Sequence, residues 1–512
     1  MKFKLFTSLF ILIFLLSFYS CKKTSIDVSK PSKNTNSVVI DNITPPGNRF
    51  QLTQDSIFLY AQQVYLWNTE LPRYNVFNPR QYKSAGSDFA NFENILFNIT
   101  RYGINPSTGK PYEYNFDKPS TTKYSYIEDL VANGTLSNNN NNTDKLRSDL
   151  EGNKDDIGYG LARFGTKTNY AIYLEFVTPG SPCEQAGLSR GDYFNTINGF
   201  SFGANYDGEI DRLIDEIYKP TVNLVGVKKN GESFNLTISE AKYVSSPIYK
   251  ESVINIGGKK IGYLAYASFT DSNNSKDALN NVFANFTSAG VTDLIIDLRY
   301  NSGGYVYTAQ QLINLIAPER INGSVMFHEY FNETVASGKA VILEKQGVGG
   351  PFNITTKFNK QSGGLRKIEN VVFMITGSTA SASELVINSL KPYINVKTVG
   401  TTSYGKPVGF FPIRIDKYDV LMSMFATKNS AGEGNYFAGL TPTFYIKDDP
   451  TKAFGDVTDT NLAAAISYLS NGAFANKAKK SILVNGEKVN SNDIFVKPLN
   501  DNGFKGMIEK RR

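Results

Sequence analysis

Residues 371–406, which read VVFMITGSTASASELVINSLKPYINVKTVGTTSYGK, most constrain what this chain can fold into. The stretch opens with an apolar run, Val371 to Ile375, of the length of a buried strand. After Gly377 and Ser378, apolar and small residues recur at helical spacing from Ala382 to Leu390. The pattern predicts a strand, a tight turn and a helix, with hydroxyl side chains at the helix N-terminus. Backbone N–H groups point there, so such a turn can hold a nucleophile beside an oxyanion site.

Composition limits the function classes. The chain has 512 residues, of which 41% are hydrophobic and 20% charged, as in a globular protein of two or three domains. The net charge of +7 comes partly from the extreme termini, and no basic stripe with interleaved aromatics is present, so nucleic acid is not an expected partner. One histidine and two cysteines argue against a zinc site, and no metal or cofactor is predicted.

The N-terminus predicts where the protein is located. Lys2 and Lys4 precede an apolar run from Leu9 to Leu16, which is too short to predict a membrane span. Ser20-Cys21 follows and resembles the lipobox of a bacterial lipoprotein, although the two residues before Ser20 are larger than usual. Residues 1–21 are therefore expected to be a signal peptide ending at a lipidated Cys21, in a protein anchored to a cell-envelope membrane and facing the periplasm or the outside. The alternative is a plain signal peptide with an incidental cysteine.

The next segments predict a tether and a helical domain. Residues 22–48 are rich in Ser, Lys, Asn and Pro, which is typical of a flexible tether. Residues 49–150 are expected to be a mostly helical N-terminal domain with irregular loops. One helix is predicted from Thr53 onward, with Thr53 or Asp55 as its N-cap, and another over Asp88 to Ile99.

Residues 151–242 change to short β-like runs separated by Gly and Asn turns. Residues 177–188 read VTPGSPCEQAGL and are followed by GD and ING, a spacing that resembles the PDZ domains of bacterial proteases. The resemblance implies that this domain binds a peptide C-terminus by strand addition, with its carboxylate held by Gly158, Tyr159, Gly160 and Leu161. The alternative for these four residues is only a glycine-rich strand start. Cys183 is expected to be a small buried filler.

Residues 243–470 alternate strands and helices, which predicts an α/β core with parallel strand pairs. Asn301-Ser302-Gly303-Gly304 follows one strand, and its glycines let the backbone approach a ligand closely. A serine in the 378–383 turn needs a base. His328, the one histidine, lies in a run without motif character, so lysine is the remaining base. Lys406 has apolar neighbours that would lower its pKa, as a neutral amine requires.

The full set of motifs resembles the C-terminal processing (tail-specific) serine peptidases, over most of residues 50–470. The resemblance implies a multidomain α/β protein with a helical N-terminal domain, a PDZ domain and a crotonase-like protease core. It implies a serine endopeptidase that cleaves protein or peptide substrates near their C-termini. Ser381 would be the nucleophile and Lys406, 25 residues later, the base. The oxyanion donors would be the N–H groups of Ala382 and of Gly303 or Gly304.

One departure keeps alternatives open. Many members of the family carry Gln four residues after the Lys, where this chain has Phe410, and Ser403 or Thr402 is a candidate substitute for that Gln. The main rival is therefore a catalytically silent, peptide-binding PDZ lipoprotein on the same fold. A small-molecule esterase or amidase is a second rival, disfavoured because no G-x-S-x-G elbow is present. Residues 471–512 are expected to be a peripheral, basic appendage with a hairpin at Asn485-Gly486.

Overall fold

The computed structural model describes residues 45–131, 150–360, 364–475, 481–485, 487–490, 493–499 and 506–508. Gly47–Arg512 form one structural unit. The predicted signal peptide, Cys21 and nearly all of the tether lie outside the described residues. Within the described part, no helix combines the length and the apolar character needed to cross a bilayer.

A six-stranded sheet forms the centre of the α/β core. Its strands are parallel from β13 onward, and β12 is antiparallel to β13, so the predicted parallel core is confirmed. All five residues of β14 are buried, as expected for a strand covered on both faces. In spatial order, the strands are β12 (Ile248–Ile256), β13 (Lys259–Tyr266), β14 (Asp293–Asp297), β18 (Asn370–Ile375), β19 (Asn395–Gly400) and β24 (Phe444–Tyr445).

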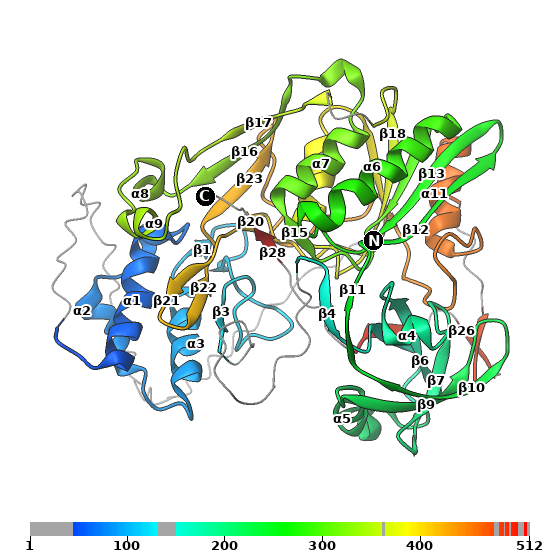
Figure 1. The fold of residues 1–512 in the computed structure, drawn as a ribbon, viewed down its shortest axis with the longest axis horizontal. Helices are drawn as coiled ribbons and strands as arrows, with labels where there is room; N and C mark the ends of the chain where they lie inside the picture. The colour runs from blue at the N-terminus through cyan, green and yellow to red at the C-terminus, as the bar shows by residue number, and fades with distance from the viewer. Residues whose placement is uncertain are drawn as a thin grey trace, which may run out of the picture. The chain divides into compact units, whose positions relative to one another are not determined.

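Helices cover both faces of this sheet (Figure 1). Leu294 and Ile296 pack in one buried cluster with α6 (Ser272–Ala289), α7 (Val306–Ile316) and α10 (Ala382–Leu390). Ile295, on the opposite face, packs with α11 (Thr460–Asn471). Alternate residues of one strand therefore serve two cores, and the result is a three-layer α/β/α arrangement.

A second sheet has the order β10-β9-β7-β6-β5-β27, with β8 paired to β7, and its pairs are antiparallel. It has its own buried cluster, which contains the fully buried Cys183, as predicted. The predicted runs form strands there. They and the two helices are β5 (Tyr159–Gly165), β6 (Tyr170–Val177), α4 (Pro182–Gln185), β7 (Tyr193–Ile197), β8 (Phe200–Ser201), α5 (Tyr206–Ile217), β9 (Thr221–Val227) and β10 (Ser233–Ser239). Two strands outside it, β4 (Asn153–Asp156) and β11 (Ala241–Val244), pair with each other.

The N-terminal residues contain α1 (Arg49–Val64), α2 (Tyr74–Phe77) and α3 (Asp88–Ile99), the last with the predicted bounds. The predicted start of the first helix is wrong. Asn48 is its N-cap, because the Asn48 side chain accepts from the Gln51 N–H and the Gln51 side chain accepts from the Asn48 N–H. These helices pack into the same buried cluster as the α/β core. Further strands here are β1 (Ile104–Asn105), β2 (Lys110–Pro111) and β3 (Tyr126–Asp129).

Smaller sheets complete the core. β3 pairs with β22 (Tyr418–Leu421), which pairs with β21 (Ile413–Ile415). A four-stranded sheet has the order β17-β16-β23-β20. Its strands and two neighbouring helices are β16 (Val325–Phe331), α8 (Glu333–Ala336), α9 (Val341–Lys345), β17 (Thr355–Lys357), β20 (Val408–Gly409) and β23 (Phe425–Asn429).

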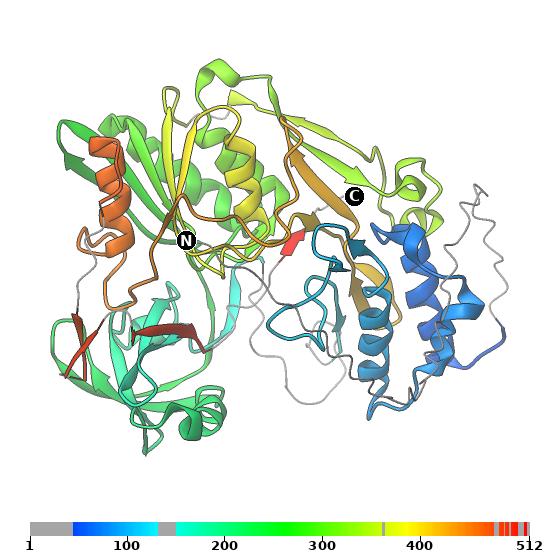
Figure 2. The same cartoon turned by 180° about the vertical axis from the view of Figure 1, so that it is seen from behind.

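The C-terminal residues contain more than the predicted hairpin. β25 (Ser481–Val484) and β26 (Glu487–Asn490) pair antiparallel, which confirms that hairpin. β27 (Phe495–Pro498) then joins the edge of the second sheet, and β28 (Gly506–Ile508) pairs with β15 (Gly303–Tyr305) of the core (Figure 2). The expectation of a peripheral appendage is wrong for these strands, because the Met507 side chain is fully buried.

Buried charges join the core to the second sheet. The Arg299 guanidinium contacts the carboxylates of Asp297, Asp459 and Asp448 at 2.7, 2.8 and 2.6 Å. Arg190, from the loop before β7, reaches Asp448 at 3.2 Å. Burial alone would raise the pKa of Asp448, but Arg190 and Arg299 lower it to about 2. Asp448 therefore stays ionised near neutral pH, and its contacts with Arg190 and Arg299 hold the end of β14, where the glycine turn begins.

Replacing Arg299 with Ala should destabilise the protein strongly, because three carboxylates would lose their buried partner. We expect the free energy of unfolding to fall by about 3–5 kcal/mol in urea denaturation. The matched control is Arg320→Ala, which breaks the half-exposed pair with Glu369 and should cost less than about 1 kcal/mol. Equal losses for the two variants would contradict the assigned role of the network.

Candidate active site

Ser381 lies at the turn between β18 and α10, as the sequence predicts. Its backbone has φ 60° and ψ −110°, a strained conformation for a residue with a side chain. Its Oγ is buried and has no hydrogen-bond partner among the described residues. Ser383, by contrast, donates to the backbone and side-chain oxygens of Asn301, and Ser378 is partly exposed. Of the three serines, Ser381 has a strained backbone and an uncommitted hydroxyl.

The Glu384 carboxylate joins the serine turn to the lysine loop. Its Oε2 accepts hydrogen bonds from the backbone N–H groups of Ser381 and Lys406, both at 2.8 Å. Its Oε1 accepts from the Gly405 N–H at 2.7 Å and from the Ser403 hydroxyl. Burial raises the pKa of Glu384, and these hydrogen bonds oppose that rise. A single buried side chain therefore sets the distance between the two segments.

No role for Glu384 was predicted from the sequence. Ser381 is the N-cap of α10 and Glu384 its third helical residue, which is the spacing of a capping box. That spacing could have indicated the contact to the Ser381 N–H. The contacts to Gly405 and Lys406 come from a distant loop and have no local signal.

Lys406 is fully buried, and desolvation lowers its pKa to about 7, although Glu113 and Glu384 act to raise it. Its Nζ lies 4.1 Å from the centre of the Phe410 ring and 5.8 Å from that of Tyr124. The expected apolar surroundings are therefore present, and Phe410 itself supplies one wall. Glu113, which the sequence did not single out, is buried and accepts hydrogen bonds from Ser125.

The glycine turn faces Ser381. A Cβ on Gly303 would lie 3.0 Å from the Ser381 Cβ, and a Cβ on Gly304 would lie 2.1 Å from the Phe269 carbonyl oxygen. Gly303 therefore lets the turn approach the serine, and Gly304 lets it approach Phe269, at φ 108° and 140°. The Gly303 N–H already donates to the Asn301 Oδ1 at 3.0 Å. Of the two predicted donors in the turn, Gly303 therefore already has an acceptor for its N–H.

Gly439 and Leu440 contact the loop that carries Lys406. The Leu440 N–H donates to the Ser403 Oγ at 2.7 Å, and a Cβ on Gly405 would lie 2.4 Å from the Gly439 nitrogen. Ser403, a candidate substitute for the missing Gln, thus binds the Glu384 carboxylate.

His328 lies on β16 and hydrogen bonds to Thr355 of β17. Within the described ranges, no cluster of three or more His, Cys, Asp or Glu side chains could hold a metal.

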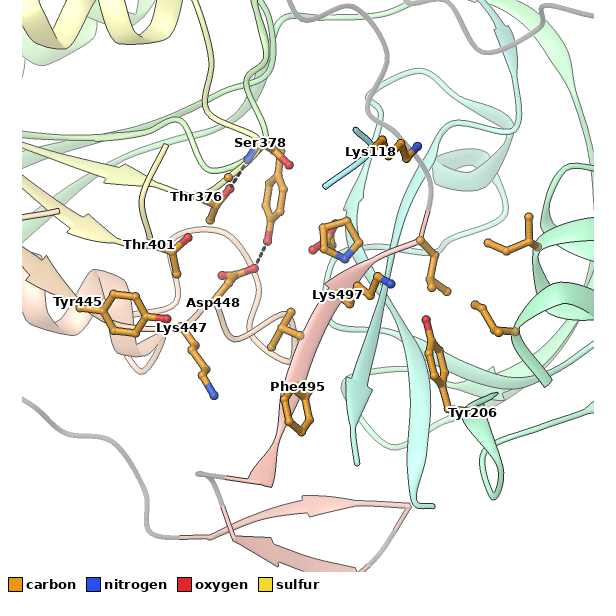
Figure 3. Close-up of a pocket in the computed structure, with 18 residues that line it drawn as sticks. Lys118, Tyr206, Thr376, Ser378, Thr401, Tyr445, Lys447, Asp448, Phe495 and Lys497 are labelled. Atoms are coloured by element: carbon orange, nitrogen blue, oxygen red, sulfur yellow. Dashed lines mark hydrogen bonds between the residues drawn. The ribbon is translucent and has the colours of Figure 1, made fainter. Parts of the chain in front are cut away.

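The predicted carboxylate loop, Gly158 to Leu161, leads into β5 at the edge that pairs with β27. The Leu499 N–H donates to the Leu161 carbonyl oxygen at 2.8 Å. A cavity of 690 Å³ lies alongside β27 (Figure 3). Its lining comes from α5 (Tyr206, Ile210, Ile214), from the core (including Thr376, Ser378 and Asp448) and from residues 495–499.

Comparison with known proteins identifies a family domain within part of this chain. Residues 260–446 match peptidase family S41. The chain carries a peptidase S41 domain. This S41 domain spans the glycine turn, Ser381, Lys406 and Phe410, and it excludes the second sheet and the C-terminal strands.

Relatives agree with this assignment. A probable CtpA-like serine protease of Staphylococcus aureus is 23% identical over 252 residues, which are 49% of this chain and 44% of the relative. A chloroplastic C-terminal processing peptidase of Tetradesmus obliquus is 23% identical over 349 residues, 64% of this chain and 66% of the relative. The chain thus spans about half to two thirds of these relatives.

A solved structure agrees with the fold. A putative S41 protease of Bacteroides fragilis superimposes with a TM-score of 0.60 at 23% identity, over 84% of this chain and 99% of the other. The S41 domain described above therefore lies within a shared mixed α/β fold.

Burial of Lys406 should make stability depend on pH. Its pKa falls to about 7 in the folded chain, so between pH 7 and about 10.5 the folded state binds fewer protons than the unfolded state, and stability rises with pH. Lys406→Met removes this dependence. We expect its gain in unfolding free energy over wild type to be largest below pH 7 and to shrink toward pH 10, in urea denaturation. Lys276→Met, at an exposed site of α6, is the control, and an equal trend there would contradict the assignment.

Proposed function

We propose that the chain is a serine endopeptidase in which Ser381 is the nucleophile and Lys406 the general base. The observation that carries the proposal is the Glu384 Oε2, which accepts from the backbone N–H groups of both residues. Support also comes from the lysine pKa of about 7 and from the Ser381 Oγ, which has no hydrogen-bond partner among the described residues. Matches to S41 peptidases favour the same activity.

The proposed reaction uses only side chains and amides of this chain. Neutral Lys406 takes the proton of the Ser381 hydroxyl as the oxygen attacks the carbonyl carbon of the scissile peptide bond. The N–H groups of Gly304 and Ala382 stabilise the oxyanion, each by about 3 kcal/mol. The C–N bond then breaks, the leaving amine receives the proton from Lys406, and an acyl-enzyme remains. Water, deprotonated by Lys406, hydrolyses the ester and restores both residues.

The proposed substrates are unfolded or C-terminal segments of proteins. Residues 151–242 would act as a PDZ domain that receives an extended segment along β5, next to Gly158–Leu161. Support comes from the outer side of β5, which pairs with one added strand, β27, at the end of the second sheet. Strand addition of this kind supplies affinity through the backbone. The resemblance to C-terminal processing peptidases supports the proposal that substrates are cleaved near their C-termini.

Ser381→Ala should abolish cleavage of an unfolded protein such as labelled casein. We expect kcat to fall at least about a thousandfold, because the attacking oxygen is removed. Ser378→Ala, three residues earlier and partly exposed, is the matched control and should stay within about twofold of wild type. Equal cleavage by wild type and Ser381→Ala would refute the dyad.

The cleavage rate should follow the ionisation of Lys406. Since the base must be neutral, kcat/KM is expected to rise about tenfold per pH unit below pH 7 and to level off above it. A rate that is flat between pH 5 and 8 would exclude Lys406 as the base. The alternative, a silent peptide-binding protein motivated by Phe410, requires that wild type bind peptides stably without cleaving them under any of these conditions.

We further propose that Cys21 is lipidated after signal removal and anchors the protein in the cell envelope. The support is the lipobox-like position of Cys21 after a short apolar run. Cys21→Ser should abolish incorporation of a labelled fatty acid and release the protein from the membrane fraction. Unchanged labelling of this variant would contradict the proposal.

A further inference from the structure

The second sheet holds a strand from its own chain at the edge predicted to bind peptides. β27 pairs antiparallel with β5, with Val496 opposite Phe164 and Pro498 opposite Ala162. The antiparallel direction brings the C-terminal end of β27 to Leu161, in the predicted carboxylate loop. Leu499 packs against the buried cluster of this sheet, and it lines the same cavity as the α5 residues Ile210 and Ile214. The Leu499 side chain therefore lies where a bound peptide would place one of its own.

The next described strand of the tail lies at Ser381. β28 pairs in parallel with the glycine turn, with Gly506 opposite Gly303 and Met507 opposite Gly304. A Cβ on Gly303 would lie 2.5 Å from the Gly506 carbonyl oxygen and 3.0 Å from the Ser381 Cβ. The Gly506 carbonyl oxygen and the Ser381 Cβ therefore both lie close to Gly303, next to the proposed oxyanion donor Gly304.

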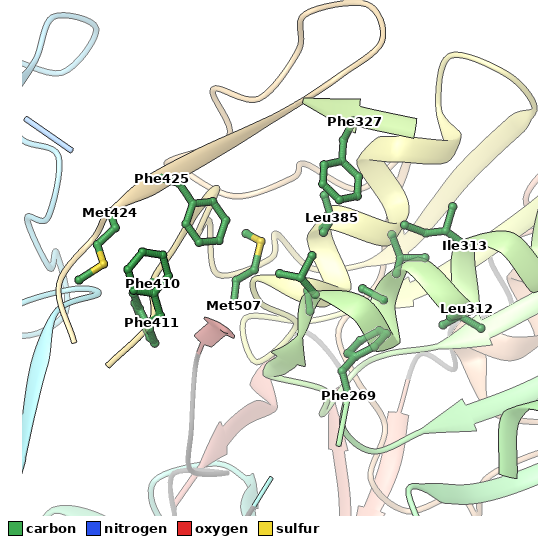
Figure 4. Packing of buried hydrophobic residues seen from close by; sticks show 14 of the residues in the cluster. Phe269, Leu312, Ile313, Phe327, Leu385, Phe410, Phe411, Met424, Phe425 and Met507 are labelled. Atoms are coloured by element: carbon green, nitrogen blue, oxygen red, sulfur yellow. The ribbon is translucent and has the colours of Figure 1, made fainter. Parts of the chain in front are cut away.

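The opposite edge of β28 also has a partner. The Phe410 N–H donates to the Met507 carbonyl oxygen at 3.0 Å, and Phe410 bridges to Ile508. The Met507 side chain is fully buried in the cluster that contains Phe410, Phe425 and Leu385 (Figure 4). β28 is therefore held on both edges by the backbone and at its centre by an apolar side chain, as an extended peptide in a protease cleft would be.

We propose that β27 and β28 occupy the substrate path, the first at the peptide-binding edge and the second at the catalytic serine, and that the protein is held inactive until they are displaced. This inference rests on the proposed peptidase function. Ser381 and Lys406 are fully buried while β28 is in place, so an external peptide cannot reach them. Because the blocking strand belongs to the same chain, its effective concentration is about millimolar, and a micromolar substrate competes poorly.

The bound strand also indicates which substrates the site accepts. The Gly506 carbonyl oxygen and the Ser381 Cβ lie 2.5 and 3.0 Å from the position of a Cβ on Gly303, and the next side chain, Met507, is fully buried. An external substrate is thus an extended segment with a small residue followed by a large apolar one. On the side of Lys406, β28 is contacted through the backbone. A Cβ on Gly409 would lie 2.8 Å from the Met507 carbonyl oxygen, so a side chain at position 409 would crowd the strand.

The test compares full-length protein with variants that release the tail. Met507→Asp buries a charge in the apolar pocket and should raise casein cleavage at least about tenfold, as should a chain that ends at Asn490. Lys276→Asp puts the same side chain at an exposed position of α6, away from both strands, and should leave the rate within about twofold. Intact mass verifies that the full-length samples keep their tail. Equal cleavage by full-length, Met507→Asp and truncated chains would overturn the inhibition while leaving the peptidase function standing.

A binding assay keeps the inference testable without catalysis. A fluorescent peptide of residues 493–512 is titrated into Ser381→Ala chains with and without the tail. We expect it to bind the truncated chain at least about tenfold more tightly, because the intact chain fills both sites itself. Peptides of residues 493–499 and 506–512 assign the two sites. If no chain cleaves casein but this difference holds, occupancy stands and the peptidase function fails. Equal binding by both chains, or none, would overturn the proposal.

Discussion

The site depends on one buried carboxylate. Glu384 is removed from water, and such a group is costly to bury unless donors surround it. Three backbone N–H groups and one hydroxyl supply those donors, and they belong to the serine turn and to the lysine loop. The same contacts that satisfy the carboxylate therefore align the two segments. Desolvation lowers the pKa of the Lys406 amine to about 7, which is the condition for a base near neutral pH.

Two further contacts extend this arrangement beyond the core. Arg190 ties the second sheet to Asp448, next to the Arg299 network at the end of β14. The C-terminal strands pair with both sheets, at β5 and at β15. Two links therefore join the predicted peptide-binding edge to the glycine turn. One is a buried ion pair, and the other is formed by β27 and β28, which contribute no layer of the core. The second connection is the one that a competing peptide can replace.

Much of the core could be predicted because its signals are local. The bounds of α3 follow from helical spacing, and those of β18 were predicted to within a residue from a short apolar run. The start of α1 was missed because its capping box uses Asn48 and Gln51, a pair of amides, in place of a hydroxyl and a carboxylate. β27 and β28 were missed for another reason. Short strands gain their stability from partners hundreds of residues away, and nothing within the tail indicates those partners.

The backbone of Ser381 has a consequence for how the protein could change. A left-handed φ at a residue with a Cβ costs on the order of 1–3 kcal/mol, and here it falls on the side chain proposed to react. Glycine would remove that cost together with the hydroxyl. Replacing Ser381 with Gly would therefore relieve backbone strain and remove the proposed nucleophile in one step, so stability and the proposed chemistry oppose each other at this position.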